Sequence, residues 1–289
     1  MTNPYRALVD AHARLRADGK SLPLGGLPDC PRMPSKPGAP RVLLFAPHPD
    51  DEVIVAGLPL RLQRELGIRV ADVAVTQGSN KARQAGRWEE LSSCCRYIGF
   101  DLIRTGPGGL EKISLKGRDA DKAGWAAAVD VVAGILRREQ PRILFFPHDL
   151  DWNATHIGVH WLVTDALRSL GPGFEALVVE TEFWGAMDDP NLMVESSAAD
   201  VADLVAALSF HVGEVRRNPY HLTLTSWMAD NVRRGGELVG GQGAAAPDFA
   251  FATLYRLRRW AKGDFRDVLD RGRSIGCNEP LSLFQETPS

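Results

Sequence analysis

The chain has 289 residues, of which 44% are hydrophobic and 24% are charged, and its formal net charge at pH 7 is −2. This composition is typical of a globular protein that buries a substantial core, and the charge gives no reason to expect nucleic acid or an anionic membrane as a partner. No apolar run approaches the roughly 20 residues that cross a bilayer, and the N-terminal segment lacks the apolar core of a signal peptide. We therefore expect a soluble, cytoplasmic protein.

The first 40 residues differ in character from the rest of the chain. Residues 5–17 have the spacing of an amphipathic helix, and the proline- and glycine-rich segment after them predicts an extended arm without regular structure. We divide the chain into an N-terminal helix and arm, residues 1–40, and a single domain, residues 41–289. The arm would suit a contact between subunits of a homo-oligomer.

From residue 41 onward, strand-like and helix-like segments alternate. The strand-like segments are residues 41–46, 69–76, 101–105, 142–147 and 176–182, and the helix-like segments are at about 52–66, 82–98, 120–138 and 156–169. This alternation predicts an α/β fold, a Rossmann-like parallel sheet with helices on both faces and right-handed crossovers. Pro59 is expected to kink the first of these helices or to shift its start.

The alternation weakens after the fifth strand-like segment. Residues 196–218 begin with serines that suit a helix cap and continue with helical spacing, and residues 224–241 predict another helix that ends at glycine. Residues 251–260 are either a late strand or an exposed segment. No internal repeat and no shift in composition divides this part into a second domain.

Two polar clusters follow strand-like segments. Residues 48–52, His-Pro-Asp-Asp-Glu, come directly after the first strand, and residues 147–160, PHDLDWNATHIGVH, come after the fourth. In an open α/β sheet, ligands bind beyond the carboxyl ends of the strands, where the strand order reverses. In the common doubly wound order the first and fourth strands are neighbours at that point, so we expect both clusters to face one cleft.

The first cluster indicates a bound cation, because three adjacent carboxylates repel one another unless a positive charge lies beside them. His48 and Asp51 are three residues apart and can point to one ion, and His156 is the simplest third ligand, with His160 as the alternative. Three protein ligands with an open fourth position form the arrangement of a catalytic zinc site. Asp50 then remains free to take a proton from water. A helix-capping cluster without metal is the other interpretation of this acidic run.

The same segments resemble a known family. "APHPDDE", followed by "VTQGSN", "RWEELSSCCRYIGF" and a histidine at a helix start, is similar to the LmbE/PIG-L family of zinc-dependent de-N-acetylases. The resemblance implies a Rossmann-like sheet, Zn²⁺ as the cofactor and an N-acetylated amino sugar as the substrate. It also implies that the zinc ligands are His48, Asp51 and His156 and that the general base is Asp50.

The chain departs from the family pattern at two places. Many members have His-Pro-Asp-His where this chain has residues 153–156, so Asn153 replaces the histidine that polarises the substrate carbonyl, and Thr155 replaces an aspartate. We expect the amide of Asn153 to donate to an oxyanion and Asp50 to protonate the leaving amine. The late His-x-Ser-Gln signature is reduced to His211, which is a catalytic candidate or else a packed helix histidine.

Several neighbouring residues carry weaker expectations. Asp151 is placed to orient a ligand imidazole, and Arg87 either contacts substrate or pairs with Glu90. Glu52 is expected beside the metal ligands or at a helix start. The tryptophans expected either to stack on a sugar ring or to pack in the core are Trp152, Trp184 and Trp227.

The sequence therefore predicts a zinc-dependent hydrolase that removes an N-acetyl or other N-acyl group from an amino sugar or sugar conjugate. An amidase that acts on a non-sugar N-acyl amine is the nearest alternative, since it uses the same residues. A metal-free Rossmann-like binding module would have a G-x-G-x-x-G motif after the first strand, which is missing here. A magnesium-dependent phosphotransferase would leave His48 and His156 without a role, because Mg²⁺ prefers oxygen ligands.

Overall fold

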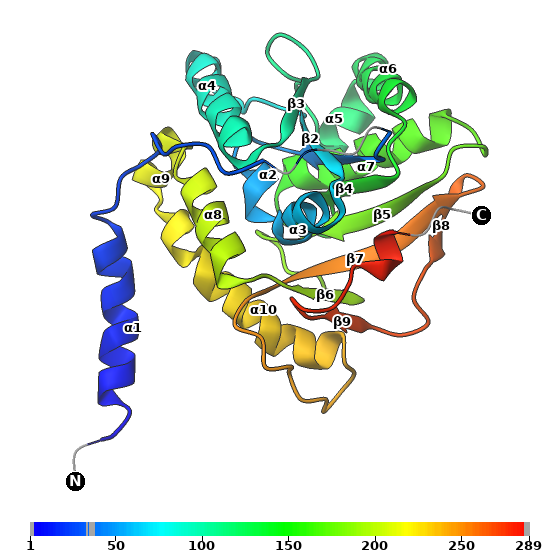
Figure 1. Cartoon of the computed structure of the whole chain (residues 1–289). Coiled ribbons are helices and arrows are strands. Elements are labelled where there is room, and N and C mark those ends of the chain that lie inside the picture. Colours follow the sequence, from blue (N-terminus) through cyan, green and yellow to red (C-terminus); the bar gives the residue numbers. More distant parts are fainter. Residues whose placement is uncertain (1–2, 33, 35–37, 286–289) are drawn as a thin grey trace.

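A single mixed sheet forms the centre of the computed structural model, which describes residues 3–32, 34 and 38–285 (Figure 1). Within the described residues the strand order is β3-β2-β1-β4-β5-β7-β6-β9, and β8 pairs with β7. The strands are β1 (Arg41–Ala46), β2 (Arg69–Ala74), β3 (Asp101–Arg104), β4 (Ile143–Pro147), β5 (Ala176–Thr181), β6 (Leu192–Glu195), β7 (Ala252–Ala261), β8 (Asp264–Asp267) and β9 (Arg273–Ile275).

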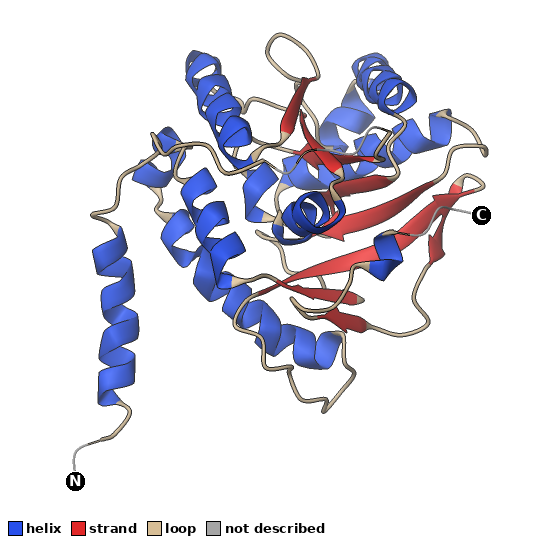
Figure 2. Ribbon diagram, in the orientation of Figure 1, coloured by secondary structure: helices blue, strands red, loops and turns tan. Residues whose placement is uncertain are grey.

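Helices cover both faces of this sheet (Figure 2). They are α1 (Arg6–Gly19), α2 (Asp51–Ile54), α3 (Gly57–Leu66), α4 (Lys81–Ile98), α5 (Leu115–Ala120), α6 (Lys122–Glu139), α7 (Ala154–Ser169), α8 (Ala198–Leu208), α9 (Val212–Arg217) and α10 (Leu224–Leu238), with short 3₁₀ segments η1 (Tyr220–Thr223) and η2 (Ser282–Phe284). No helix of the described chain is long and apolar enough to cross a membrane.

The alternation of side chains along the central strands builds two cores, one on each face. In β1, Val42 and Leu44 pack with α3, α4 and α8, whereas Leu43 and Phe45 pack with α6 and α7. Because both faces are covered, the strand is apolar over nearly its whole length, which is typical of parallel strands. The expected α/β architecture with helices on both faces is confirmed.

The predicted elements of the first 182 residues agree with the structure in type and nearly in bounds. The first helix-like segment is divided into α2 and α3, and Pro59 lies in the first turn of α3, where a proline is tolerated. The expected shift of the helix start at Pro59 is therefore observed. The segment 251–260 is a strand, β7, and the helical segment 196–218 is two helices, α8 and α9, separated at residues 209–211.

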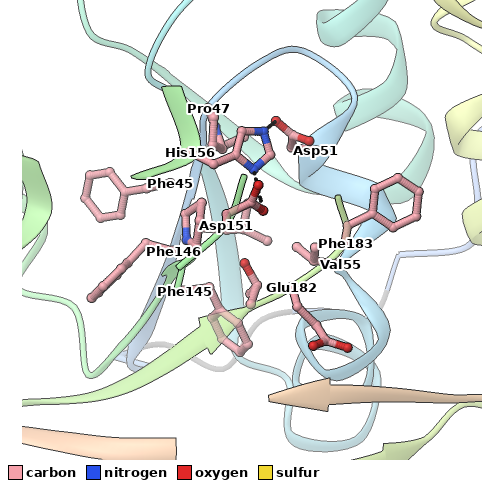
Figure 3. Close-up of a pocket in the computed structure, with 14 residues that line it drawn as sticks. Phe45, Pro47, Asp51, Val55, Phe145, Phe146, Asp151, His156, Glu182 and Phe183 are labelled. Atoms are coloured by element: carbon pink, nitrogen blue, oxygen red, sulfur yellow. Dashed lines mark ion pairs between the residues drawn. The ribbon is translucent and has the colours of Figure 1, made fainter. Parts of the chain in front are cut away.

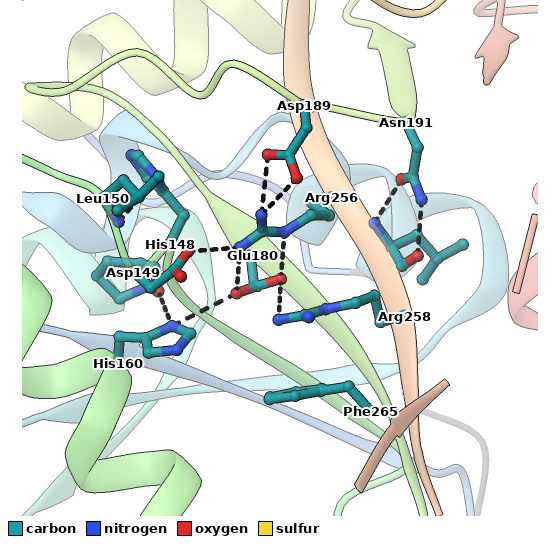
Figure 4. Close-up of polar contacts among 12 residues, drawn as sticks. His148, Asp149, Leu150, His160, Glu180, Asp189, Asn191, Arg256, Arg258 and Phe265 are labelled. Carbon is teal, nitrogen blue, oxygen red and sulfur yellow. Dashed lines mark hydrogen bonds and ion pairs between the residues drawn. The ribbon is translucent and has the colours of Figure 1, made fainter. Parts of the chain in front are cut away.

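The sheet departs from the expected all-parallel arrangement beyond β5. Strand β7 runs antiparallel to both β5 and β6, and it is the connection between the parallel half and the C-terminal strands. Buried ion pairs accompany this junction: Glu180 on β5 contacts Arg256 and Arg258 on β7, each at 2.7 Å (Figure 4). These arginines of strand β7 lie 76 and 78 residues after Glu180, so the local sequence pattern did not predict the pairing.

The N-terminal helix lies apart from both cores. No residue of α1 is buried, and Figure 1 shows the helix standing away from the sheet and its layers. The described residues between α1 and β1 form no helix or strand, as expected for the arm, while residues 33 and 35–37 of the arm lie outside the described part.

We predict that Glu180→Gln lowers the free energy of unfolding by about 3–5 kcal/mol, because it leaves two arginines facing a neutral amide in a buried site. Glu180 has no exposed surface. The matched control is Asp101→Asn, whose ion pair with Arg69 is 43% exposed on both sides and should contribute less than about 1 kcal/mol. Urea denaturation measures both, and equal losses would contradict the prediction.

Candidate functional site

The two polar clusters meet at the carboxyl ends of β1 and β4. These strands are parallel neighbours, with Leu44 opposite Phe145, so the loops that follow them leave the sheet side by side. The loop after β1 carries residues 47–52, and the loop after β4 leads into α7. The expectation that both clusters face one site is thus confirmed by the strand order.

His48, Asp51 and His156 form a compact group of possible metal ligands. The Oδ2 atom of Asp51 lies 3.4 Å from His48 Nδ1 and 3.2 Å from His156 Nε2, and the ligand atoms of all three lie within 4.8 Å of one another. Two ligand atoms bonded to one tetrahedral zinc ion at about 2.0–2.1 Å would be separated by roughly 3.3 Å. The spacing of the three side chains therefore fits a shared small cation.

The surroundings of His156 favour positive charge at this position. Burial alone would lower the pKa of His156, but the carboxylates of Asp51 and Asp151 raise it to about 10. Its Nε2 atom is buried and has no hydrogen-bond partner among the described residues, and its Nδ1 atom lies 3.4 Å from Asp151 Oδ2. Figure 3 shows the imidazole between these two carboxylates. The donor set of two imidazoles and one carboxylate fits a bound metal, and Asp151 lies where it can orient the His156 ring, as expected.

His160 does not join this group. Its Nδ1 atom lies 3.0 Å from the carbonyl oxygen of Pro147 and 3.4 Å from Glu180, and the side chain is buried. His156 lies on the same helix, one turn earlier, and it is the histidine that reaches Asp51. The structure therefore favours His156 over His160 as the third ligand.

Asp50 lies beside the group in an unusual backbone conformation. Its φ is +119°, a region that non-glycine residues rarely adopt, and such strain costs on the order of 1–3 kcal/mol. The backbone N–H of Asp50 donates to Glu52 Oε2 at 2.7 Å, and its Oδ2 accepts the hydroxyl of Tyr220. Burial and the charge of Asp51 raise the pKa of Asp50 to about 7, partly offset by His211 and by the Tyr220 hydrogen bond. In contrast, the pKa of Asp51 is lowered, because the two histidines outweigh its burial.

Glu52 and His211 form an ion pair behind the site. Glu52 Oε1 lies 2.6 Å from His211 Nε2, and neither side chain has exposed surface. Because the other oxygen of Glu52 holds the backbone of Asp50, the pair supports the strained loop. This geometry fits the packed alternative for His211 rather than a direct contact with substrate, and Glu52 lies beside the predicted ligands as expected.

The remaining expectations have mixed outcomes. Asn153 caps α7 through its Oδ1, which accepts from the Thr155 N–H at 2.9 Å, so its amide NH₂ remains available as a donor. Arg87 does not pair with Glu90: it donates to the Pro49 carbonyl at 3.1 Å and lies 3.6 Å from Glu214. The expected pairing was wrong because α9, distant in sequence, brings Glu214 to this helix.

The three tryptophans gather on one side of the site. Trp184 packs against Phe183 and Tyr220, and Trp227 packs against Phe183. Trp152 is 71% exposed and donates its indole N–H to the Trp184 carbonyl at 2.8 Å. Trp184 and Trp227 are therefore partly packed, and Trp152 alone presents a largely free ring.

Two polar residues close to the site were not identified from the sequence. Tyr220 contacts Asp50 from 170 residues away and carries no local signal. Asp72 lies in the middle of β2, fully buried, with no hydrogen bond to either carboxylate oxygen among the described residues. Burial and the charges of Glu52 and Asp51 raise the pKa of Asp72 well above its usual range. An aspartate inside an apolar strand was the signal that could have identified it.

An open cavity of about 470 Å³ adjoins His48. Its walls come from the segment 76–84, the segment 110–114 and the start of α7. The polar side chains on these walls are Thr76, Ser79, Lys81, Gln84, Glu111, Lys112, Ser114 and Thr155. A second, narrow cavity of about 10 Å³, with room for about one water, lies against Asp51 and His156 and is lined mainly by apolar side chains (Figure 3).

Comparisons with known proteins agree with this architecture. Residues 43–167 match the profile of the PIG-L family, described as GlcNAc-PI de-N-acetylase, while no curated protein matches the chain. Among solved structures, the chain is similar to N,N'-diacetylchitobiose deacetylase from Pyrococcus horikoshii, with 17% identity, coverage of 88% of this chain and 93% of that chain, and a TM-score of 0.55.

Two further structures show how widely this fold is used. One is the A40926 pseudoaglycone deacetylase Dbv21, with 14% identity, coverage of 78% and 98%, and a TM-score of 0.56. The other is GalB, the 4-carboxy-2-hydroxymuconate hydratase from Pseudomonas putida KT2440, with 18% identity, coverage of 75% and 95%, and a TM-score of 0.54. Since a hydratase and deacetylases share it, the fold alone does not determine the reaction, and the side chains of the site must.

We predict that His211→Ala lowers the free energy of unfolding by about 3–5 kcal/mol, because it leaves the buried carboxylate of Glu52 without its cation. The control is His221→Ala, since His221 is also buried but has no ion pair in the described part of the chain. Its loss should be clearly smaller in the same urea titration. Similar losses for the two variants would show that the Glu52–His211 pair does not support the loop.

Proposed function

The chain belongs, over residues 43–167, to the PIG-L family, and we propose that it is a zinc-dependent hydrolase that removes an N-acetyl or similar small N-acyl group from an amino sugar or sugar conjugate. The observation that carries this proposal is the convergence of His48, Asp51 and His156 from two loops, with a second carboxylate, Asp50, beside them and not among them. The arrangement therefore offers three ligands for a metal ion and one further carboxylate that can act as a base.

The metal ligands in this proposal are His48, Asp51 and His156. A zinc ion there would act as a Lewis acid on the amide carbonyl and lower the pKa of water toward about 7. The side chain of Asp151 keeps the His156 ring oriented through Nδ1, so that Nε2 faces Asp51. Two imidazoles and one carboxylate leave coordination positions for a water and for substrate.

Asp50 is the proposed general base. Its raised pKa lies near neutral pH, where a base combines adequate strength with availability in the charged form. It takes the proton of the attacking water and, once protonated, returns it to the leaving amine. The amide NH₂ of Asn153 is the proposed donor to the carbonyl oxygen as negative charge develops there.

The Glu52–His211 pair has a positioning role in this proposal. Glu52 accepts the N–H of Asp50 at 2.7 Å and thereby supports the backbone conformation of Asp50, with its φ of +119°. His211 holds the Glu52 carboxylate in place through the 2.6 Å contact between its Nε2 and Glu52 Oε1. His211 therefore acts through the loop and touches no reacting atom.

The polar lining of the cavity beside His48 favours a sugar substrate over an apolar amine. Its walls present hydroxyl, amide, ammonium and carboxylate groups, which are suited to hydrogen bonds with a polyhydroxylated ring. The exposed ring of Trp152 offers a flat apolar surface on the α7 side of the site. An amidase for a non-sugar amine remains the alternative, because it would use the same metal ligands and base.

We predict that two variants distinguish the base from a metal ligand. Asp50→Asn should retain about one zinc per chain but lose on the order of 10²–10⁴ in the rate of acetate release, because only the base is removed. His156→Ala should lose both zinc and activity. Elemental mass spectrometry measures the metal, and acetate release is followed with N-acetylglucosamine conjugates and with simple N-acetyl amines side by side.

The control for this experiment is His160→Ala, which removes a histidine from the same helix and should keep the zinc. Zinc retained by His156→Ala but lost from His160→Ala would move the third ligand to His160. Wild-type protein without a transition metal, even after zinc is offered, would refute the proposal. Faster release from the simple amines than from the sugars would favour the amidase.

We also predict that Tyr220→Phe moves the acidic limb of the pH profile of kcat/KM to higher pH. The Tyr220 hydroxyl donates to Asp50, and a donor stabilises the charged carboxylate and lowers its pKa. Without this bond the pKa of Asp50 rises, so the base is protonated, and activity lost, at a higher pH than in the wild type. The control is Tyr97→Phe, whose hydroxyl lies near Asp203. An unchanged limb in Tyr220→Phe would contradict the role of Asp50.

A further inference from the structure

The strained backbone at Asp50 is held at both ends of one peptide unit. The peptide bond between Pro49 and Asp50 is planar, so its carbonyl oxygen and its N–H rotate together. The N–H donates to Glu52 Oε2 at 2.7 Å, and the carbonyl oxygen accepts from Arg87 Nη2 at 3.1 Å. A rotation of this unit changes the φ of Asp50, which is +119°, and breaks both hydrogen bonds. The two bonds therefore oppose relaxation of the strained φ.

Arg87 reaches this peptide unit from α4. Its side chain is only 14% exposed, and its Nη1 atom lies so close to Gly78, in the loop after β2, that a Cβ atom at position 78 would collide with it. The φ of Gly78 is +79°, which also favours glycine. The guanidinium of Arg87 is therefore packed between the loop after β1, which carries the proposed ligands and base, and the loop after β2.

Glu214 on α9 anchors this guanidinium. Its Oε1 atom lies 3.6 Å from Arg87 Nε and also contacts Arg83. Its Oε2 atom accepts from Arg217 Nη2 at 2.5 Å. The side chain of Glu214 is 4% exposed, and a carboxylate buried to this degree requires such cationic partners. Arg87 is thus fixed between a backbone carbonyl and a buried carboxylate.

The segment that supplies Glu214 also supports the same peptide unit at two other points. This α9 segment, residues 211–220, begins with His211, which contacts Glu52, and ends with Tyr220, whose hydroxyl donates to Asp50. These two contacts reach the N–H end of the peptide unit and the side chain that follows it. The ion pair with the guanidinium reaches the carbonyl end. One short segment therefore secures the whole unit.

We propose that Arg87 is a positioning residue, held by Glu214, that keeps the Pro49–Asp50 peptide in the orientation in which the Asp50 carboxylate serves the reaction. The inference rests on the function proposed above, in which Asp50 is the base. Arg87 acts through the Pro49 carbonyl and touches no reacting atom. A direct contact between Arg87 and substrate, the role that the sequence left open, is the rival assignment.

The first test separates kcat from KM. Arg87→Met removes the donor to Pro49 and should lower kcat about 10–100-fold, the usual effect of losing a group that orients a site, with KM nearly unchanged. Glu214→Gln should lower kcat less, since the bond to Pro49 remains. A raised KM with unchanged kcat in Arg87→Met would assign Arg87 to substrate contact and overturn the proposal.

The matched control is Arg83→Met. Arg83 also pairs with Glu214, but its side chain is 40% exposed and has no hydrogen bond to residues 48–52, all of which the structure describes. This variant should retain most of its kcat. Equal losses of kcat in Arg83→Met and Arg87→Met would show that the ion pairs of Glu214, and not the bond to Pro49, determine the effect, which would contradict the proposal.

Chemical rescue distinguishes positioning from a loss of stability. Arg87→Ala leaves room beside Glu214 and Pro49 for a guanidinium ion, so millimolar guanidinium chloride should recover part of kcat relative to sodium chloride at the same concentration. Glu214→Gln should show no recovery, because Arg87 still fills its place. Guanidinium weakens folded proteins, so an Arg87→Ala variant that is merely unstable should lose still more activity, and that outcome would overturn the proposal.

Amide hydrogen exchange keeps this inference separate from the proposed function, since it needs neither substrate nor metal. Residues 47–54 should exchange faster in Arg87→Met than in Arg83→Met or the wild type, because the Pro49–Asp50 peptide is released. If the wild type releases no acetate from any N-acetyl probe, the proposed function fails and exchange alone decides on Arg87. Equal exchange of residues 47–54 in the two variants would then refute its role in holding the loop.

Discussion

Burial of consecutive carboxylates is the constraint on which this structure depends. Asp50, Asp51 and Glu52 follow one another at the end of β1, and each is at least nine-tenths buried. A buried carboxylate costs several kcal/mol unless a cation or hydrogen-bond donors compensate it. The chain supplies a different partner to each: two histidines to Asp51, the Tyr220 hydroxyl to Asp50, and His211 to Glu52.

These different partners give neighbouring residues different chemistry. The pKa of Asp51 is lowered and that of Asp50 is raised to about 7, although the two are adjacent in sequence. The backbone conformation of Asp50 lets the side chains of Asp50 and Asp51 reach different partners, and Glu52 accepts a hydrogen bond from that backbone. Titratable groups whose environments move their pKa values apart are the usual sign of a divided role, here metal ligand and base.

Local sequence determined much of this protein. The strands of the parallel half, the polar clusters after β1 and β4, and the grouping of His48, Asp51 and His156 follow from hydrophobic periodicity, from one specific motif and from the rule that ligands bind at the carboxyl edge of a sheet. Each of these depends on residues that are close in sequence, or on strands whose order is common.

Only the tertiary structure decided the rest, because the contacts join residues far apart in the chain. Tyr220 reaches Asp50 across 170 residues and His211 reaches Glu52 across 159, and neither segment contains a local pattern that specifies its partner. Strand β7 lies antiparallel to β5, and this placement brings Arg256 and Arg258 to 2.7 Å from Glu180, a pairing that no local pattern specifies. Whether His156 or His160 joins the metal group depends on how α7 packs on β4. His156 reaches Asp51, whereas His160, one helical turn later, is buried against the carbonyl of Pro147.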